Sequence, residues 1–376
     1  MLTGPDGTIR RNWSSATQNT VKLSDLENPS ILIVRLSAIG DIVFATPLIH
    51  AIRRRYPEAR ISWLVQAESK DLLECHPELD QVLVWPRQAW EDQWKKRRWL
   101  DLWRAIRQFR QVLKAHRFDV ALDVQSLMKS GFLTWLSGAE HRIGLGSREG
   151  SQWLMDQVIT KGGEPTRIAS EYHHFAQQLE LPVDEFEMHI GLSDEDNSQA
   201  DALLTAHGLE RGFIAICPFT TRPQKHWFNS SWNELLTAVG QQWQLPVVML
   251  GGSGDRSSSL AIGGRNQESL INLTGETTLR QAAALIKRAK LIIGVDTGLT
   301  HMGIAMNRPT LCLFGSTRPY LDTTHENAAV IYHPRQCSPC KRKPTCNGSF
   351  DCMRDIKVTE VMRHASRLAG LDGRVR

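Results

Sequence analysis

The residues best suited to chemistry in this chain of 376 residues lie in three short polar segments. Ser37–Asp41 ends with a carboxylate directly after a glycine, and Pro218–Trp227 combines threonine hydroxyls with Arg222 and Lys225. Asp296–His301 reads Asp-Thr-Gly-Leu-Thr-His. A carboxylate that faces a cleft can take a proton from an attacking hydroxyl, and hydroxyls with cations in one loop suit a phosphate. The segments therefore predict a site that combines a base with phosphate-binding groups.

Each segment also has a plainer interpretation. Asp41 lies at a predicted helix start, where aspartate is a good N-cap, and Pro218–Trp227 could be a solvated basic loop. Asp-Thr-Gly is also the aspartic protease signature, but that chemistry needs two carboxylates that share a proton, and this chain has a single Asp-Thr-Gly. The turn Gly251–Asp255 would let a nucleotide approach the backbone, although it matches neither the dinucleotide-binding pattern nor the P-loop.

Short apolar runs alternate with helical patterns along most of the chain. Strands are expected at 31–36, 61–65, 82–85, 120–124, 213–217, 247–250, 291–295 and 310–314, and helices at about 42–56, 193–207 and 279–289. This alternation indicates βαβ units and an α/β fold of two doubly wound halves that meet near 190–195. Ligands bind at the carboxyl ends of such strands, which is where the three polar segments fall.

The apolar residues exclude a membrane-spanning protein. No stretch approaches the roughly 18 consecutive apolar residues that a membrane-spanning helix requires. Residues 1–30 are polar, lack the apolar core of a signal peptide, and are expected to form a flexible N-terminal extension. We therefore expect a cytoplasmic protein whose seven cysteines are reduced, because structural disulfides are rare in that compartment.

Residues 87–117 form a basic aromatic segment. They hold ten Lys and Arg against three Asp and Glu, whereas the whole chain has a formal net charge of +5. Five tryptophans lie in or beside this segment, at Trp85, Trp90, Trp94, Trp99 and Trp103. One interpretation is an amphipathic helix whose tryptophans lie half in the core. The other is a surface for anionic lipid head groups and acceptor phosphates. No nucleic-acid-binding motif accompanies the charge, so nucleic acid is not an expected partner.

Four cysteines cluster near the C-terminus, at Cys337, Cys340, Cys346 and Cys352. Four thiolates could hold a structural zinc ion or an iron–sulfur cluster, although the spacing is not that of a standard zinc finger. Disulfides and reduced, packed thiols are the alternatives. In each case we expect the cluster to lie away from the chemistry.

Four ordered motifs resemble glycosyltransferase family 9, the lipopolysaccharide heptosyltransferases. The motifs are Ser37–Asp41, Asp123–Ser130, Thr220–Trp227 and Gly294–His301, and the similarity runs from about Ile31 to Leu321. The resemblance implies the GT-B fold, in which two Rossmann-like domains face each other across a cleft, and a metal-independent, inverting transfer. It implies an N-terminal acceptor-binding domain at 31–192 and a C-terminal nucleotide-sugar-binding domain at 193–376 that carries the cysteine cluster at 337–352.

The resemblance also implies roles for single residues. Asp41 is the expected general base, and Lys225 is the expected phosphate-binding and second catalytic residue. The donor, ADP-L-glycero-D-manno-heptose, is expected to contact Thr220, Thr221, Lys225, Asp296, Thr297, Gly298 and His301. The acceptor, Kdo-lipid A or a lipopolysaccharide core, is expected to contact Arg87, Lys95, Arg97, Lys129 and Arg148. No cofactor and no catalytic metal ion are expected.

Several alternatives stay open within this resemblance. The Thr-Thr-Arg loop and Arg148-Glu149 are most similar to family members that add the first heptose to Kdo-lipid A, and members that act on an already heptosylated core are the nearest alternative. A non-catalytic lipid- or metal-binding scaffold would not need both Asp41 and Lys225. A nucleotide-sugar epimerase on the same fold would not need the basic aromatic segment. A lipid acceptor further implies a peripheral location on the cytoplasmic face of the inner membrane.

Overall fold

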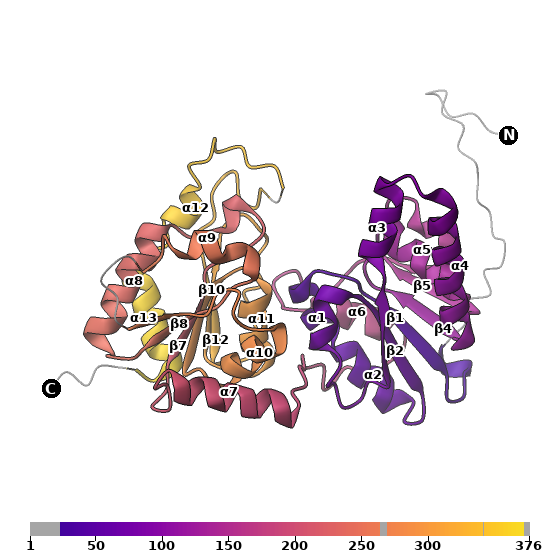
Figure 1. The fold of residues 1–376 in the computed structure, drawn as a ribbon, viewed down its shortest axis with the longest axis horizontal. Coiled ribbons are helices and arrows are strands. Elements are labelled where there is room, and N and C mark those ends of the chain that lie inside the picture. Colours follow the sequence, from indigo (N-terminus) through magenta and orange to yellow (C-terminus); the bar gives the residue numbers. More distant parts are fainter. Residues whose placement is uncertain (1–22, 264–268, 341, 372–376) are drawn as a thin grey trace.

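The computed structural model describes residues 23–263, 269–340 and 342–371, which form two α/β halves (Figure 1). Each half contains a six-stranded sheet whose strands pair in parallel. The first sheet has the order β3-β2-β1-β4-β5-β6, and the second has the order β12-β11-β10-β7-β8-β9. The prediction of an α/β fold with two doubly wound sheets is therefore confirmed.

The strands are short and lie in both halves of the chain. Those of the first sheet are β1 (Ser30–Val34), β2 (Arg60–Gln66), β3 (Gln81–Trp85), β4 (Val120–Asp123), β5 (His141–Leu145) and β6 (Gln157–Ile159). Those of the second sheet are β7 (Ile214–Cys217), β8 (Val247–Met249), β9 (Leu270–Asn272), β10 (Leu291–Val295), β11 (Thr310–Phe314) and β12 (Ala328–Tyr332).

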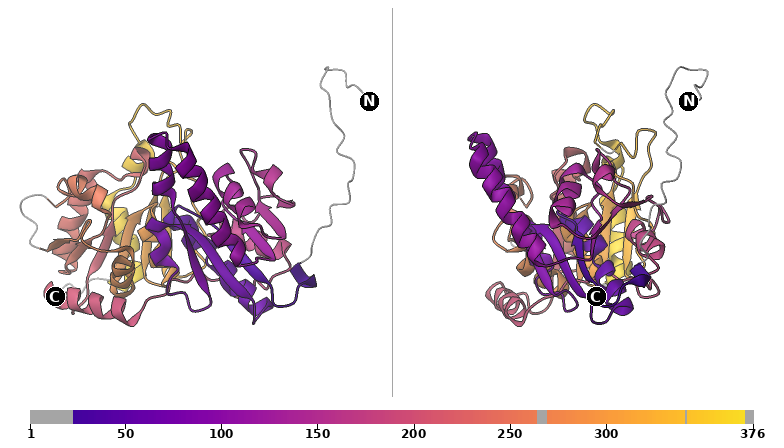
Figure 2. Two further views of the ribbon diagram at one scale, coloured as in Figure 1. Left: turned by 45° about the vertical axis from the view of Figure 1, so that its right-hand side comes forward. Right: turned by 90° about the vertical axis from the view of Figure 1, so that its right-hand side faces the viewer.

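Helices connect the strands. In the first half these are α1 (Ile39–Ala45), α2 (Pro47–Arg55), α3 (Arg87–Lys95), α4 (Trp99–Ala115), α5 (Met128–Ser137) and α6 (Ser170–Gln178). They are followed by α7 (Asp194–Ala206), α8 (Asn229–Gln242), α9 (Arg256–Ser259), α10 (Leu279–Arg288), α11 (Gly298–Ala305), α12 (Asp351–Arg354) and α13 (Val358–Ala369). Helices α3 and α4 pack against each other, and α4 stands away from the body of the molecule in the right-hand view of Figure 2.

The central strands form the core of each half. Every residue of β1, β4, β7, β10 and β11 is buried, because helices cover parallel sheets on both faces. Each fully buried aliphatic side chain stabilises the fold by roughly 1.5–3 kcal/mol relative to an exposed one. This burial explains why these strands appear in the sequence as continuous apolar runs.

Both sheets reverse their strand order at the centre, between β1 and β4 in the first and between β7 and β10 in the second. Ligands of doubly wound folds bind at the carboxyl ends of the strands beside such a reversal. Asp41, Lys225 and Asp296 follow β1, β7 and β10 in the chain, and the loop after β4 leads to Lys129. The topology therefore places the predicted motifs at the two reversal points.

The structure differs from the predicted elements in two ways. The helix expected over about 42–56 is two helices, α1 and α2, which are separated at Thr46. Pro47 has no N–H group and cannot continue the hydrogen bonding of α1. The prediction also missed β5, β6, β9 and β12. Both β6 and β9 have three residues and lie at sheet edges, where a strand needs no continuous apolar run.

The beginning of the chain is only partly described. Residues 1–22 of the predicted extension lie outside the described residues. Leu23–Asp25 forms a 3₁₀ turn, and Leu23 is buried in the same cluster as Ile31 and Ile33. Residues from Leu23 onward therefore belong to the packed fold. The boundary predicted near 192–193 falls directly before α7, which begins at Asp194.

The connection between the halves is tightly packed. A Cβ atom on Gly191 would lie 1.8 Å from the backbone oxygen of Cys75. Arg280 of α10 forms ion pairs with Glu74 (Nη1 to Oε2, 3.0 Å) and Asp196 (Nε to Oδ1, 3.1 Å). Glu74 belongs to the first half, so Arg280 links the two halves beside the connecting segment.

Three histidines line a cavity of about 640 Å³ next to this connection. His76 is buried, and its ring lies 4.9 Å from that of His189. Burial, followed by the charges of His189 and His50, lowers the pKa of His76 to about 3. Carboxylates on the same wall include Glu78, which contacts His50 (Oε1 to Nδ1, 2.9 Å). His76 therefore stays neutral in the folded protein where an ordinary histidine would take up a proton.

We predict that this histidine makes the fold sensitive to mild acid. Below pH 6.5 the unfolded chain protonates His76 but the folded protein does not, so the free energy of unfolding decreases by up to about 1.4 kcal/mol per pH unit. His76→Gln should reduce this slope between pH 6.5 and about 4, measured by urea unfolding at several pH values. The exposed His207 supplies the control His207→Gln, and an equal slope in both variants would contradict the assignment.

Candidate active site

A cavity of about 440 Å³ lies between the two halves at the carboxyl ends of their sheets. Its volume is within the range of small-molecule sites. The first half contributes Ala38, Ile39, Gly40, Asp41 and Phe44, and the second contributes Thr220, Thr221, Arg222, Lys225, Asp296, Thr297, Gly298, His301, Phe314, Thr317, Arg318 and Tyr320. The structure thus brings together every residue predicted to be catalytic or donor-binding, while their individual roles stay predictions.

The loop after β7 is held in place by its own contacts. Pro223 begins a 3₁₀ turn that ends at Lys225. The ring of His226 contacts the Thr220 carbonyl oxygen (Nε2 to O, 2.8 Å), and the buried Trp227 donates its indole N–H to the carbonyl oxygen of Ile356 (3.1 Å). These anchors direct Lys225 toward the cavity that it lines.

Asp296 is the centre of a polar network on the wall of the second half. Its carboxylate contacts Lys225 (Oδ2 to Nζ, 2.6 Å) and His301 (Oδ1 to Nε2, 3.2 Å), and it accepts a hydrogen bond from the Thr317 hydroxyl. The other ring nitrogen of His301 lies 2.7 Å from the Tyr320 hydroxyl oxygen. Four loops or helices are therefore connected through one carboxylate.

The charges of this network determine the ionisation of Asp296. Burial alone would raise the pKa of the Asp296 carboxyl. The hydrogen bond and charge of His301, and the charge and hydrogen bond of Lys225, outweigh burial and hold that pKa well below its usual range. Asp296 is therefore a carboxylate with fixed partners and is a poor candidate for a base that must accept a proton.

Asp41 has a different environment on the wall of the first half. It is the third residue of α1, whose N-cap is Ala38, so the interpretation of Asp41 as the N-cap is wrong. Its carboxylate accepts a long hydrogen bond from the Ala38 N–H (3.4 Å) and forms an ion pair with Arg35. The Asp41 side chain is 47% exposed. It is therefore oriented by Arg35 but remains accessible to a substrate hydroxyl.

Two glycines allow the walls to approach each other. A Cβ atom on Gly40 would lie 2.5 Å from Cδ2 of His301, and one on Gly298 would lie 2.4 Å from Cγ2 of Ile39. The ring of Phe44 also packs 4.7 Å from that of His301. Helices α1 and α11 consequently meet at their N-terminal ends, which brings Asp41 to the same cavity as Asp296.

The predicted acceptor residues fall into two groups. Burial, followed by the charges of Arg87 and Arg35, lowers the pKa of Lys129, so these three cations lie near one another. The Arg148 N–H donates to the Ser126 carbonyl oxygen (3.0 Å), which holds the loop of Arg148 beside the segment that leads to Lys129. The exposed Lys95 and Arg97 instead lie at the far end of α3. The structure therefore separates Lys95 and Arg97 from the group beside Arg35.

The sequence interpretation missed several residues at this site. Thr317, Arg318 and Tyr320 follow β11 and line the cavity, so the strand-end argument applied to the other loops would have found them. Arg35 was missed because it lies within an apolar run. It is buried, and it donates to the carbonyl oxygen of Val124 (Nη1 to O, 2.9 Å), so it joins the loops after β1 and β4. The turn Gly251–Asp255, by contrast, contributes no residue to this cavity.

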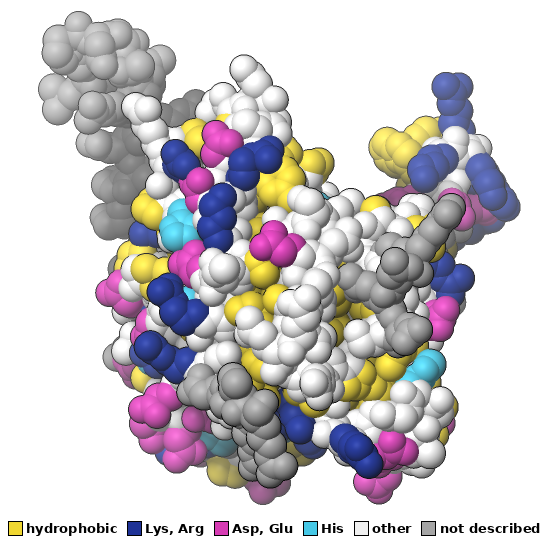
Figure 3. All heavy atoms as spheres, turned by 90° about the vertical axis from the view of Figure 1, so that its left-hand side faces the viewer, with side chains coloured by type: hydrophobic (Ala, Val, Ile, Leu, Met, Phe, Trp, Pro, Cys, Tyr) yellow, Lys and Arg dark blue, Asp and Glu magenta, His cyan; other side chains and the backbone are white. Residues whose placement is uncertain are grey.

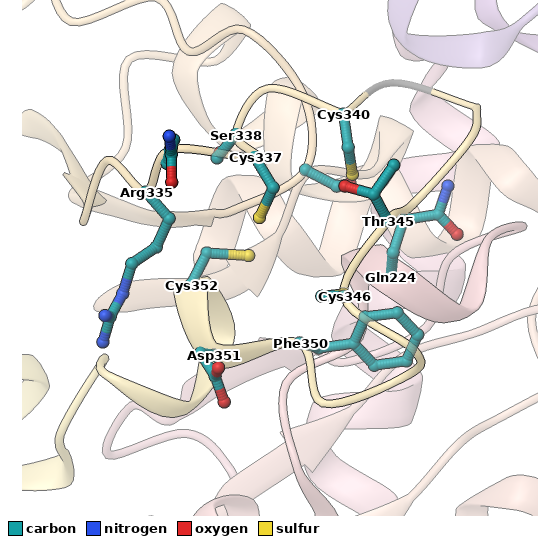
Figure 4. Close-up of a pocket in the computed structure, with 12 residues that line it drawn as sticks. Gln224, Arg335, Cys337, Ser338, Cys340, Thr345, Cys346, Phe350, Asp351 and Cys352 are labelled. Carbon is teal, nitrogen blue, oxygen red and sulfur yellow. The ribbon is translucent and has the colours of Figure 1, made fainter.

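The four clustered cysteines line a second cavity, of about 500 Å³ (Figure 4). All four are free thiols. Within the described ranges, no group of three or more His, Cys, Asp or Glu side chains is placed to hold a metal ion. The structure therefore gives no support to the predicted zinc or iron–sulfur site at Cys337, Cys340, Cys346 and Cys352.

The position of the cysteine cavity was also predicted wrongly. Gln224, the neighbour of Lys225, lines this cavity, as does Ser316, the neighbour of Thr317. A Cβ atom on Gly315 would lie 2.9 Å from the Cys352 sulfur atom. The cysteine segment thus packs directly behind two loops of the candidate active site.

The fold and the site together define a class of protein. Two parallel sheets of Rossmann strand order share a polar cavity, with a carboxylate on one wall and a lysine with hydroxyls on the other. The solved structure described as E. coli heptosyltransferase WaaC with ADP-2-deoxy-2-fluoro heptose has the same fold, with a TM-score of 0.69, 20% identity, and coverage of 90% of this chain and 99% of that chain. The fold is therefore GT-B.

Sequence comparison identifies the family. The model of glycosyltransferase family 9 (heptosyltransferase) matches residues 106–350. Lipopolysaccharide heptosyltransferase 1 of Salmonella typhimurium is 26% identical over 304 residues, or 77% of this chain and 90% of that protein. Lipopolysaccharide heptosyltransferase 2 of Escherichia coli (strain K12) is 27% identical over 354 residues, which cover 90% of this chain and 98% of that protein. The chain belongs to glycosyltransferase family 9 and is a glycosyltransferase, as the motifs predicted.

Among the helices of residues 23–263, 269–340 and 342–371, none is both long enough and apolar enough to span a bilayer.

We predict that the glycine contact between α1 and α11 is needed for turnover. Gly40→Ala should lower kcat/KM for glycosyl transfer by about tenfold to a hundredfold, because the added methyl group displaces Asp41 from the wall that carries His301. Gly240→Ala in α8 is the matched control, since a Cβ there meets nothing within 4 Å. Equal rates for the two variants would show that the close approach has no catalytic importance.

Proposed function

We propose that this glycosyltransferase transfers L-glycero-D-manno-heptose from ADP-heptose to the Kdo-lipid A inner core of lipopolysaccharide, with inversion and without a catalytic metal ion. The observation that carries the proposal is the cavity shared by Asp41 on one wall and by Lys225, Thr297 and Gly298 on the other. In an inverting displacement the base and the leaving group lie on opposite sides of the sugar, and these two walls supply the two sides.

The wall of the second half suits a diphosphate. The Lys225 ammonium group has three N–H donors, so it can keep its contacts with the Asp296 side chain and carbonyl oxygen and still donate to a phosphate oxygen. Thr297 is the N-cap of α11, and Gly298 is its first residue. The first N–H groups of a helix have no partner within the helix and bind anions well. Thr220 and Thr221 add hydroxyls on the same wall.

Asp41 is the proposed base. As the acceptor oxygen attacks the anomeric carbon, its proton passes to the Asp41 carboxylate, the bond from that carbon to the phosphate oxygen breaks, and ADP leaves. Arg35 orients the carboxylate and acts as a positioning residue. Lys225 and the N-terminus of α11 stabilise the charge that develops on ADP, which is the electrostatic help that a metal ion would otherwise give.

The acceptor position is a proposal between two close alternatives. The loop Thr220–Lys225 and the Arg148–Glu149 pair favour addition of the first heptose. Addition to an already heptosylated core is the alternative, and the match to lipopolysaccharide heptosyltransferase 2 across 90% of this chain supports it. The cations Arg87, Lys129 and Arg148, which belong to the first half, suit the phosphates and carboxylates of either acceptor. A lipid acceptor would place the enzyme at the cytoplasmic face of the inner membrane.

The acceptor is tested by measuring ADP release from ADP-heptose with de-O-acylated Kdo-lipid A, with a heptosylated core, and with no acceptor. Release that depends on Kdo-lipid A would support transfer of the first heptose. Release with the heptosylated core alone would move the reaction to the next position. If neither acceptor causes ADP release although the donor still binds, the proposed acceptor class would be contradicted.

Asp41→Asn should separate chemistry from donor binding. Loss of the base is expected to lower kcat by about 10²–10⁴-fold, while ADP affinity, measured by calorimetry, stays nearly unchanged because Asp41 lies on the opposite wall. A fall in ADP affinity comparable to the fall in kcat would refute the assignment as a base.

Lys225→Ala should weaken both donor binding and turnover. A charge-assisted hydrogen bond contributes about 1.5–3 kcal/mol, so the dissociation constant for ADP should rise by about one to two orders of magnitude. Turnover should fall further, because the negative charge on the leaving group grows in the transition state. Lys290→Ala, on the loop between α10 and β10, serves as the control. If Lys225→Ala binds ADP with wild-type affinity, Lys225 does not contribute to the donor site.

A further inference from the structure

The end of α3 and the beginning of α4 expose large apolar side chains next to cations. We call residues 94–104 the hairpin tip. Trp94, Trp99, Leu100 and Trp103 are 61%, 50%, 72% and 57% exposed. The four consecutive cations Lys95–Arg98 are exposed as well. This combination is unusual in a surface helix, whose large apolar side chains normally face the core.

The core does not need these tryptophans. Trp90 is buried, and its ring packs 5.9 Å from that of Trp85 and 5.7 Å from that of Phe109. Leu102, Ile106, Phe109 and Leu113 form the stripe of α4 that faces this core. The interpretation of the tryptophans as half-buried core residues is therefore correct for Trp85 and Trp90 and wrong for Trp94, Trp99 and Trp103.

The exposed side chains are organised as one projecting surface. The rings of Trp94 and Trp99 pack 4.7 Å apart in a T shape, and the Arg107 guanidinium lies 5.4 Å from the ring centre of Trp103. Figure 3 shows this projection at the upper right, where hydrophobic and basic side chains lie together. Because the surface is convex, it cannot enclose a small ligand. It is better suited to insert into an extended, deformable surface.

The charge of the hairpin tip selects an anionic partner. The tip carries Lys95, Lys96, Arg97, Arg98 and Arg104, and its acidic residue, Asp101, is paired with Arg98 (2.8 Å) and Arg104 (3.4 Å). Tryptophans place their rings at the level of lipid head groups, and clustered cations are attracted to anionic lipids. Nucleic acid would satisfy the cations and stack its bases on the tryptophan rings, but it would leave the aliphatic side chain of Leu100 in water.

The same hairpin leads back to the active site. Arg87 begins α3 and belongs to the group of cations around Lys129 and Arg35. Lys95 is eight positions after Arg87, which is about 12 Å along a helix at 1.5 Å per residue. A tip embedded among lipid head groups would therefore hold this cationic group just above the membrane surface.

We propose that the hairpin tip inserts into the head-group layer of an anionic bilayer, so that the enzyme works on an acceptor that remains in the membrane. This inference rests on the proposed function for the lipid nature of the acceptor. Trp94, Trp99, Leu100 and Trp103 enter the interface, and Lys95–Arg98 contact the phosphates of the lipids.

The binding test uses the full chain and vesicles of phosphatidylethanolamine mixed with phosphatidylglycerol, with phosphatidylcholine vesicles for comparison. The tip variant is Trp99→Ser/Leu100→Ser/Trp103→Ser. Its matched control is Trp153→Ser/Leu260→Ser, which removes two apolar side chains that are 80% and 79% exposed elsewhere. Because all five positions are half exposed or more, both variants should fold, which far-UV circular dichroism and the thermal midpoint would verify.

The expected result is co-sedimentation of the parent and of the control with the anionic vesicles, and a loss of about tenfold or more in the tip variant. Tryptophan fluorescence of the parent should shift to shorter wavelength with the anionic vesicles and little with phosphatidylcholine. Equal binding of the tip variant and the parent would overturn the proposal. Retention of the parent by a single-stranded oligonucleotide but not by the anionic vesicles would also overturn it.

A transfer assay separates this inference from the proposed reaction. With soluble, de-O-acylated acceptor the tip variant should match the parent, because the tip lies outside the cavity. With acceptor embedded in vesicles the tip variant should lose activity. If neither protein transfers heptose, the proposed function fails, and the sedimentation result still decides the membrane contact. If the tip variant loses transfer activity equally with soluble and with embedded acceptor, the tip acts on catalysis or folding and not on membrane binding.

Discussion

The close approach of α1 and α11 is the constraint on which the active cavity depends. Both helices present their N-terminal ends, which carry unpaired N–H groups and the positive end of the helix dipole. Gly40 and Gly298 permit this contact, because a Cβ atom on either would overlap the opposite helix. Two positive helix ends in one cavity favour bound anions, and the protein places a carboxylate near each: Asp41 in the first turn of α1 and Asp296 before α11. An anionic ligand in this cavity would therefore lie in a field that both halves of the chain create.

The two carboxylates differ because their surroundings differ. Asp296 is buried, and a buried charge is tolerated when it is paired and hydrogen-bonded. Lys225, His301 and Thr317 meet that need, and they fix the positions of the loops after β7 and β11. Lys225 is thus already oriented before the donor binds, which reduces the reorganisation that binding requires. Asp41 is half exposed and contacts Arg35, so it can exchange a proton with a substrate. The two aspartates are therefore suited to different roles, Asp296 to a structural one and Asp41 to a chemical one.

The strand-end loops could be predicted from the sequence because β1, β4, β7 and β10 are buried on both faces and appear as apolar runs with polar residues directly after them. Edge strands such as β6 and β9 give no such signal, so they were missed. The break at Thr46 was visible in Pro47 and was overlooked.

Two results required the tertiary structure. The cysteine segment packs against Gly315 and Gln224, which are distant in sequence, and no spacing rule reveals that contact. Similarly, Arg35 appears in the sequence as a charge within an apolar strand, and its pairing with Asp41 depends on the loop between them.

The basic aromatic segment was recognised correctly from its composition, but the fold divides its cations between two separate surfaces. Residues 87–117 share one charge pattern, which favoured a single acceptor-binding surface. A helix, however, is a rigid rod, and its two ends face different surroundings. The first residue of α3, Arg87, lies near Lys129 and Arg35, where its charge contributes to lowering the pKa of Lys129. The last residue, Lys95, lies at the exposed hairpin tip with no part in that group. An anionic ligand beside Lys129 would offset the charges of Arg87 and Arg35, which help to lower the pKa of Lys129. The first group is therefore suited to binding one acceptor molecule in a defined position, and the tip to a diffuse anionic surface.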